Sequence, residues 1–401
     1  MKSLSIMLIA GEASGDLLAA ELAVALREAA IGAASKPTRD AQPLDTPLAP
    51  RFFGAGGPRM AAAGVDLAFD LTQHSVIGLS DVLKKIATFR NLLRQLLNLA
   101  IEQQPDFVIG VDYGGFNLHL ARAIREHVRR HRTEFVPWNP KIVQFISPQV
   151  WASRPARADA MARDHDLVLS IFPFEKAWYA RRVPKLRVEF VGHPMVERIQ
   201  NSEFRIQKQE NGSVPRILLL PGSRTAELRR HLPPMLGAWK RIRSELPSAT
   251  ATMVLPNENL AALARELGVS PEITLQIGNL PKALAQSDVA IASTGTVTME
   301  CAFFGVPTVT LYKTSWSTYQ VAKRIVTVKS LTMPNLLAGE PVFPEFVQGD
   351  ATAANLAGAA LELLKNKNRR DEVRRKLEKI IATLGGPGAT RRAAEAILSL
   401  S

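Results

Sequence analysis

The sequence predicts an α/β protein built from two doubly wound parallel-sheet domains. Near-continuous runs of Val, Ile and Leu recur along the chain, and such strands are buried on both faces, as in parallel sheets covered by helices. Amphipathic helical patterns separate most of these runs. A polar stretch at residues 199–215, rich in Glu, Gln, Asn and Lys, divides the runs into two series. Two such series indicate two domains that face one cleft.

Each series contains five predicted strands. Those of the first series span residues 4–10, 106–111, 141–146, 167–171 and 188–191. Helical patterns in this series begin near Ser14, Asp81, Phe116, Arg157 and Pro173. The strands of the second series span residues 216–220, 250–255, 273–277, 289–292 and 308–311.

The end of the chain is helical. The helical pattern begins at Asn355 and has a Gly-Gly-Pro-Gly break at residues 385–388 before a last helix. We expect an N-terminal domain of residues 1–198, completed by the C-terminal helices at about 345–401, and a second domain of residues 199–344. A Pro-rich insertion at residues 36–49 follows the first helix, and its role is left open.

Composition excludes several classes of protein. The 401 residues are 46% hydrophobic and 22% charged, which is enough for a sizeable core and excludes wholesale disorder. A single cysteine excludes a disulfide-stapled scaffold, and with only seven histidines it leaves little material for a metal site. The longest apolar runs, such as residues 4–10, have the length of a buried strand and are too short to span a membrane. We expect a cytoplasmic protein, soluble or peripherally attached to a membrane.

The chain is strongly basic. Fifty Lys and Arg residues against 37 Asp and Glu give a net charge of +13, which attracts nucleic acid, an anionic membrane surface or phosphorylated substrates. The basic residues are scattered over many predicted helices with few interleaved aromatic residues, and the sequence contains no recognised nucleic-acid motif. This pattern disfavours a nucleic-acid partner.

Two loops after predicted strands of the first domain carry candidate functional residues. Residues 11–16, Gly-Glu-Ala-Ser-Gly-Asp, open a helix, where small residues allow close approach of a ligand and free N–H groups suit an anion. The structural alternative makes Ser14 a helix cap, with Glu12 and Asp16 favouring the helix dipole. Asp112 leaves a buried strand, so partial burial would raise its basicity towards that of a general base. Its structural alternative is a turn or helix cap.

Two loops of the second domain suit a phosphate group. Gly222 and Ser223 offer backbone and hydroxyl donors, and Arg224 offers a guanidinium fork; a capped helix with a surface Arg is the alternative. Residues 294–296, Thr-Gly-Thr, provide hydroxyls and a glycine at a helix start. Glu300 lies on about the same helical face as Thr296 and could accept hydrogen bonds from ribose hydroxyls.

Two further segments allow more than one interpretation. The loop at residues 331–339 contains Asn335 behind a proline and by itself would be assigned to a turn. Residues 75–97 alternate apolar side chains, among them Val82, Ile86 and Phe89, with lysines and arginines. An apolar face bordered by cations suits acyl chains and anionic headgroups, whereas an ordinary core-facing helix gives the same pattern.

Taken together, nine short motifs in matching order between about residues 6 and 346 resemble the lipid-A-disaccharide synthase family. They are Ala10–Asp16 (AGEASGD), Gly54–Met60 (GAGGPRM), Val111–Asn117 (VDYGGFN), Ser147–Ala152 (SPQVWA), Pro173–Lys176 (PFEK), Val191–Pro194 (VGHP), Leu219–Arg224 (LLPGSR), Thr294–Glu300 (TGTVTME) and Pro334–Gly339 (PNLLAG). The resemblance implies an inverting glycosyltransferase of GT-B architecture, with two Rossmann-like domains. It would join UDP-2,3-diacylglucosamine to 2,3-diacylglucosamine 1-phosphate (lipid X), giving a β-1,6-linked disaccharide 1-phosphate and UDP.

The resemblance also implies roles for particular residues. Asp112 would be the general base, and Glu12 and Asp16 would orient the acceptor or support the base. The UDP-sugar would be held by Gly222, Ser223, Arg224, Thr294, Gly295, Thr296, Glu300 and Asn335. The lipid acceptor or the membrane would be contacted by Ser14, Asn117, Val82, Ile86 and Phe89.

The same resemblance implies partners and a location. Both substrates are anionic and acylated, which agrees with a basic protein at the inner face of the bacterial cytoplasmic membrane. We expect neither a metal nor another cofactor, because positive charge and helix-terminal N–H groups can stabilise departing UDP. The oligomeric state is left open, with a homodimer as one alternative.

Three residues depart from the family pattern, and three other functions compete with this one. Gly114 and Gly115 stand where the family commonly has Pro-Asp, and Ser153 stands where it commonly has Trp, which leaves acyl-chain preference open. The rival enzymes are other UDP-sugar GT-B proteins: a transferase acting on a lipid-linked peptidoglycan precursor or a UDP-N-acetylglucosamine 2-epimerase. A nucleic-acid-binding protein is the rival of a different class.

Overall fold

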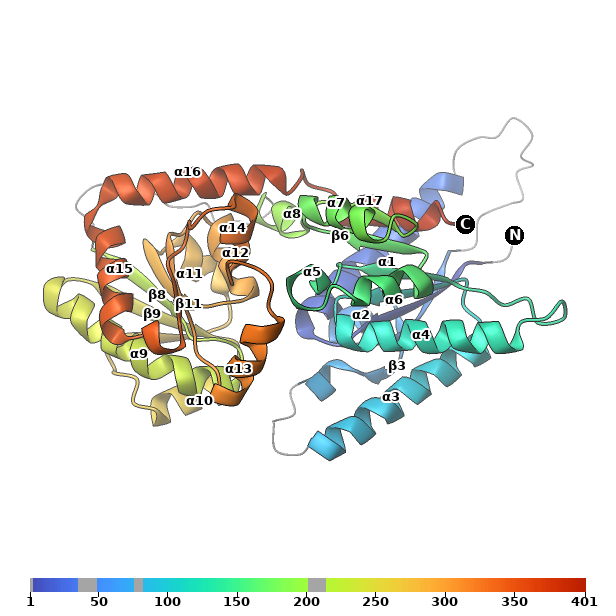
Figure 1. Ribbon diagram of the computed structural model, residues 1–401, viewed down its shortest axis with the longest axis horizontal. Coiled ribbons are helices and arrows are strands. Elements are labelled where there is room, and N and C mark those ends of the chain that lie inside the picture. Colours follow the sequence, from blue (N-terminus) through green and yellow to red (C-terminus); the bar gives the residue numbers. More distant parts are fainter. Residues whose placement is uncertain (1–2, 35–48, 76–81, 201–213) are drawn as a thin grey trace. The chain divides into compact units, whose positions relative to one another are not determined.

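The computed structural model describes residues 3–34, 49–75, 82–200 and 214–401, with only the backbone described at 33–34, 74–75 and 82–86. It divides into two compact units, residues 1–194 with 385–401 and residues 195–384, each built on one parallel sheet (Figure 1). Nearly all of the insertion at 36–49 and most of the polar stretch at 199–215 lie outside the described residues.

The sheet of the first unit has seven strands in the order β3-β2-β1-β4-β5-β6-β7. The strands are β1 (Ser5–Ala10), β2 (Arg51–Gly56), β3 (Asp66–Asp70), β4 (Phe107–Val111), β5 (Lys141–Phe145), β6 (Leu167–Ser170) and β7 (Arg187–Phe190). The helices are α1 (Ala13–Ala34), α2 (Pro58–Ala62), α3 (Val82–Gln103), α4 (Gly114–His131), α5 (Val150–Ser153), α6 (Arg157–Asp164), α7 (Pro173–Arg182) and α17 (Ala389–Leu398). The strand order reverses between β1 and β4, and ligands of such sheets bind at this switch point, beyond the carboxyl ends of the strands.

The sheet of the second unit has six strands in the order β10-β9-β8-β11-β12-β13. The strands are β8 (Arg216–Leu220), β9 (Thr250–Leu255), β10 (Ile273–Ile277), β11 (Val289–Ser293), β12 (Thr308–Tyr312) and β13 (Glu345–Val347). The helices are α8 (Met195–Gln200), α9 (Thr225–Glu245), α10 (Glu258–Glu266), α11 (Leu280–Ala285), α12 (Thr296–Phe303), α13 (Trp316–Ile325), α14 (Met333–Ala338), α15 (Ala353–Lys365) and α16 (Lys367–Thr383). Its switch point lies between β8 and β11.

All ten predicted strands are confirmed to within one residue at each end. β1 and β4 are buried along almost their whole length, as their continuous apolar sequences require. The sequence did not predict β2, β3 and β13. Glycines weaken the strand pattern of β2, Asp residues begin and end the edge strand β3, and β13 has only three residues.

The C-terminal helices divide differently from the prediction. Helix α15 packs along α9, and α16 packs on α12 and α14, so residues 345–384 belong to the second unit (Figure 1). Only α17 completes the first unit, where its buried Ala393 and Ile397 join the core that contains Leu22 and Leu26 of α1. The Arg392 Nε–H also donates to the Val191 carbonyl at 2.8 Å. The apolar faces of α15 and α16 pack against helices of the second unit. The sequence pattern shows that these faces are apolar but does not show which unit they pack against.

Candidate functional site

In the first unit, the loops after β1 and β4 meet at the switch point. The register pairs Ala10 with Val111, so the residues that follow these strands are neighbours. Only glycine fits at position 11, because a Cβ there would lie 2.2 Å from the Tyr113 ring. The structure therefore brings the two predicted loops of this domain together, with Glu12 half-buried beside Asp112.

The backbone of Asp112 is held in an uncommon conformation. Its φ is +50° and that of Tyr113 is +45°, a left-handed region that costs a non-glycine residue about 1–3 kcal/mol. The Asp112 carbonyl accepts hydrogen bonds from Asn117 Nδ2 at 2.8 Å and Gln144 Nε2 at 2.9 Å. The Asp112 N–H donates to the Phe145 carbonyl at 2.9 Å. Two side-chain amides and a neighbouring strand thus hold the strained turn.

The carboxyl group of Asp112 is tuned towards proton acceptance. Burial raises the pKa of Asp112 above its usual value, the negative charge of Glu12 raises it further, and the backbone N–H of Tyr113 opposes both effects. Asp112 is not the N-cap residue of α4, because that position is Tyr113, whose side chain makes no capping bond. A carboxylate with raised basicity at a strand end is suited to general-base chemistry.

Asp16 has a structural role that the sequence did not predict. Its carboxylate is buried and accepts hydrogen bonds from the backbone N–H groups of Gly57 at 2.8 Å, Arg59 at 3.0 Å and Met60 at 3.0 Å. These bonds satisfy the first turn of α2, whose free N–H groups favour a negative charge. The geometry gives Asp16 the role of fixing this turn, and its predicted role toward the acceptor or the base stays a prediction.

The residues predicted to contact the acceptor or the membrane are placed differently from one another. Ser14 is exposed in the first turn of α1. Asn117 is buried, and its amide donates a hydrogen bond to the Asp112 carbonyl. The Phe89 ring lies 5.0 Å from that of Phe116, edge to face, and packs on the core that contains Leu92. This contact favours the core-helix alternative at Phe89. The side chains of Val82 and Ile86 lie outside the described residues.

A buried pair joins two of the motifs, at residues 147–152 and 173–176. The Trp151 Nε1–H donates to Glu175 Oε1 at 2.9 Å, and the Phe172 N–H donates to Glu175 Oε2 at 3.3 Å. Glu175 is completely buried, and this burial raises its pKa to about 7. The sequence did not single out this pair, because its partners lie 24 residues apart.

This burial predicts a pH-dependent stability. The pKa of Glu175 rises from 4.5 to about 7 on folding, so the folded protein binds the proton more tightly than the unfolded chain. Its contribution is complete below about pH 4.5 and is lost as the pH rises through 7, which amounts to about 3 kcal/mol. Denaturation midpoints at pH 5 and pH 8 should show a larger loss for the wild type than for Glu175→Gln.

A residual slope should remain in Glu175→Gln, because burial raises the pKa of Glu300 in the same direction. Equal slopes for wild type and variant would contradict the prediction.

In the second unit, the loops after β8 and β11 meet in the same way. The register pairs Leu220 with Ala292, which brings residues 222–224 next to residues 294–296. Gly222 has φ +117°, and a Cβ there would lie 2.4 Å from Glu227 Oε2. The Arg224 side chain is 70% exposed, with Glu227 at 3.4 Å as its ion-pair partner.

The turn after β11 is open to a ligand. Gly295 has φ +132° and is the N-cap of α12, with no side chain capping the helix. Gly295 and Thr296 are exposed, and Thr294 is half-buried. The first turns of α9 and α12 therefore lie at one sheet edge, an arrangement whose N–H groups attract an anion.

His231 links two loops of this edge and was missed from the sequence. Its Nδ1 lies 2.8 Å from the Pro221 carbonyl, and its Nε2 accepts the Lys313 N–H at 3.0 Å. Burial lowers the pKa of His231, and a neutral ring with the proton on Nδ1 satisfies both contacts. His231 lies on the buried face of α9 with Leu228 and Leu232. Its place among these apolar residues was the only sign in the sequence that its side chain is buried.

Glu300 and Asn335 have different environments. Burial raises the pKa of Glu300 to about 7, and the positive charge of Arg198 acts in the opposite direction. The Asn335 Nδ2 donates to the Phe343 carbonyl and to Glu345 Oε1, both at 2.8 Å, and its Oδ1 accepts the Val342 and Phe343 N–H groups at 2.8 Å. These four bonds occupy both N–H groups and the oxygen of the amide, so Asn335 shapes the loop. Its predicted contact with the nucleotide sugar stays a prediction.

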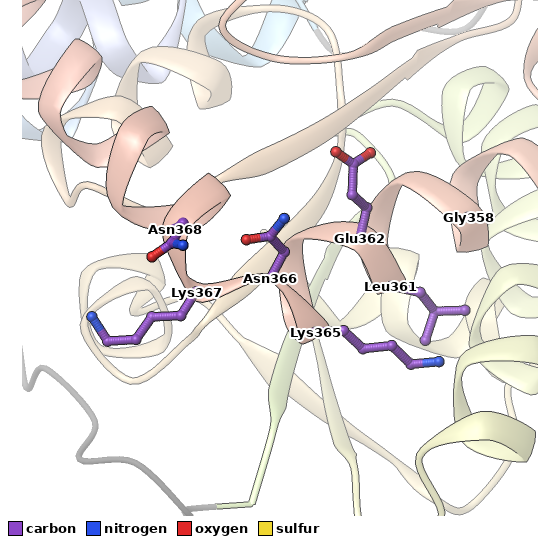
Figure 2. Close-up of a pocket in the computed structure, with 7 residues that line it drawn as sticks. All are labelled: Gly358, Leu361, Glu362, Lys365, Asn366, Lys367 and Asn368. Atoms are coloured by element: carbon purple, nitrogen blue, oxygen red, sulfur yellow. The ribbon is translucent and has the colours of Figure 1, made fainter.

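A surface pocket of the second unit lies away from that unit's switch point. Figure 2 shows it at the corner between α15 and α16, lined by Gly358, Leu361, Glu362, Lys365, Asn366, Lys367 and Asn368. Lys365 is paired with Glu245, and Lys367 with Asp371 at 2.6 Å. Its cations are neutralised and it does not lie at a strand end, so it is not part of the candidate site. Within the part of the chain that the structure describes, no cluster of three or more His, Cys, Asp or Glu side chains is placed to hold a metal ion.

Comparisons of structure show the fold. An S. aureus MnaA–UDP co-structure matches 99% of this chain and 98% of its own with a TM-score of 0.64 at 13% identity. A MurG from Acinetobacter baumannii matches 99% of this chain and all of its own with a TM-score of 0.54 at 14% identity. These likenesses confirm the predicted GT-B architecture of two parallel-sheet units.

Comparisons of sequence go further. The sequence pattern described as lipid-A-disaccharide synthetase matches residues 6–399. Proteins named lipid-A-disaccharide synthase from Myxococcus xanthus and Geobacter sulfurreducens are each 34% identical over 98% of this chain and 97% of their own length. The MnaA and MurG structures share the fold at much lower identity. The chain therefore belongs to the lipid-A-disaccharide synthase family.

Proposed function

We propose that this chain transfers the diacylglucosamine group of UDP-2,3-diacylglucosamine to the 6-hydroxyl of lipid X, with Asp112 as the general base. The products are a β-1,6-linked disaccharide 1-phosphate and UDP. Family membership supports the reaction and its substrates. The observation that carries the residue assignment is the clamped Asp112 turn at the first switch point, where burial and Glu12 raise the pKa of the carboxyl group.

In the first unit, Asp112 acts on the acceptor. A sugar hydroxyl is a poor nucleophile, so a base removes its proton as it attacks the anomeric carbon from the face opposite UDP. Glu12 lies beside the base, raises its basicity and orients the acceptor. Asp16 and Asn117 act through the backbone turns that they hold, and they are positioning residues.

In the second unit, residues 222–224 and 294–296 hold the diphosphate. The guanidinium of Arg224 and the first turns of α9 and α12 stabilise the charge that develops on departing UDP. Glu300 accepts hydrogen bonds from the ribose hydroxyls. His231 keeps the loops after β8 and β12 in place, and Asn335 shapes the loop at residues 339–345.

Because both substrates are acylated, we expect the reaction to take place at an anionic membrane surface. The net charge of +13 attracts such a surface, and we place the protein at the inner face of the cytoplasmic membrane as a peripheral protein. Within the described residues, no helix combines the length and the apolar character needed to cross a bilayer.

An enzyme assay tests the proposal. The purified chain, incubated with UDP-2,3-diacylglucosamine and lipid X in mixed micelles, should release UDP and disaccharide 1-phosphate in equal amounts. Asp112→Asn is the matched control and should release both products at a rate lowered by about 10²–10⁴-fold. Absence of both products from the wild type, together with turnover of UDP-N-acetylglucosamine alone, would favour the epimerase alternative.

A further inference from the structure

Three residues that each carry a buried polar atom without a partner line one cavity of the first unit. Among the described residues, the buried side-chain atoms with no hydrogen-bond partner are Asn117 Oδ1, Gln144 Oε1, His165 Nδ1 and, in the second unit, Trp239 Nε1. The first three residues all line a cavity between α4, β4 and β5. An unpaired buried polar atom costs about 1–3 kcal/mol, and three around one cavity indicate a shared ligand.

The orientation of both amides is fixed by the carbonyls that they contact. Asn117 Nδ2 and Gln144 Nε2 donate to the Asp112 carbonyl at 2.8 and 2.9 Å, and Gln144 Nε2 also lies 3.1 Å from the Ile146 carbonyl. Carbonyl oxygens only accept hydrogen bonds, so each amide must present its NH₂ group to them. The two amide oxygens are therefore left as acceptors for the cavity.

His165 supplies the complementary group. It is buried at the C-terminal end of α6, and burial lowers its pKa to about 4. Asp164, the backbone of Met161 and Asp166 oppose this effect, and Arg125 adds to it. The ring is therefore neutral near pH 7 and carries one N–H. If that proton is on Nδ1, the cavity is bordered by two acceptors and one donor.

The cavity has the size and chemistry for one water molecule. Its volume is about 10 Å³, close to the roughly 10–15 Å³ that a single water requires. A water molecule can donate to both amide oxygens and accept from the His165 Nδ1–H, which satisfies all three atoms at once. Buried waters typically make about three such bonds.

We propose that one buried water molecule joins His165, as its Nδ1–H tautomer, to Gln144 and Asn117, and that this network fixes the amides that clamp Asp112. His165 is then a positioning residue, which acts on Asp112 through the water and the two amides. This second role rests on the proposed function of Asp112 as the base, whereas the water site itself does not.

Two measurements test the water site without activity. Long-range ¹H–¹⁵N spectra of histidine-labelled full-length protein should show His165 as the neutral Nδ1–H tautomer from pH 8 down to about pH 5. A high-resolution crystal structure should show one ordered water within hydrogen-bonding distance of all three atoms. An Nε2–H tautomer, a charged ring at pH 7 or a dry cavity would overturn the proposal.

Paired variants at position 165 test the positioning role. His165→Leu removes the donor and should lower kcat about tenfold with little change in KM, since small displacements of a catalytic group act mainly on turnover. His165→Asn places an amide N–H near the former Nδ1 and should recover most of kcat. The exposed His131→Leu on α4 is the control and should match the wild type.

Equal kcat values for the Leu and Asn variants, or a change in KM alone, would overturn the positioning role. If His165→Leu fails to fold, the tautomer and the bound water remain decisive. Full turnover of Asp112→Asn would instead refute the base assignment and leave the water site standing.

Discussion

Asp112→Asn is expected to lower kcat by about 10²–10⁴-fold, which is the usual contribution of a general base. The substitution replaces the carboxylate that accepts the proton and keeps the size of the side chain. The backbone should stay in place, because Asn adopts the left-handed conformation that Asp112 and Tyr113 have here. Steady-state assays of UDP release measure the loss.

Calorimetry provides the control for Asp112→Asn. The affinity for UDP should equal that of the wild type, because the residues assigned to the nucleotide belong to the second unit. Asp112→Ala should lose turnover and stability together, since alanine is strained at φ +50°. Near-normal turnover of Asp112→Asn would remove Asp112 from the role of base.

Asp16→Ala is expected to destabilise the first unit by about 3–5 kcal/mol, because it removes a buried carboxylate that accepts three backbone hydrogen bonds. The N–H groups of Gly57 and Met60 would remain buried without a partner. For a unit of this size, the expected fall in Tm is about 10 °C, measured by thermal melting.

Two controls separate the structural from the catalytic role of Asp16. Asp16→Asn retains one acceptor oxygen and should show an intermediate Tm. Asp66→Ala removes an exposed carboxylate from β3 of the same unit and should leave Tm unchanged. A normal Tm for Asp16→Ala combined with lost turnover would show that Asp16 acts on the substrate instead.

The strands and the location of the candidate site could be predicted from the sequence because both depend on local pattern. Continuous apolar runs specify buried parallel strands, and loops that follow them collect at one sheet edge. Thus the Asp112 loop meets the Gly11 loop, and the Gly222 loop meets the Thr294 loop, through strand register alone.

The use of individual polar side chains could not be predicted in the same way. Asp16 and Asn335 have the chemistry of substrate ligands, yet they bond backbone groups and, for Asn335, also the Glu345 carboxylate, which only the folded chain brings near. Asp16 bonds a turn 41–44 residues away, and Asn335 bonds a loop 7–10 residues away. His231 spans 82 residues to Lys313, and its apolar neighbours on α9 gave no sign of that contact.

The most direct test of the account is a crystal structure of the chain with bound UDP. We expect the diphosphate against Gly222–Arg224 and Thr294–Thr296 of the second unit, the ribose hydroxyls at Glu300, and an Asp112 carboxylate free of nucleotide contacts. A diphosphate bound instead at Gly11 and Glu12 of the first unit would contradict it.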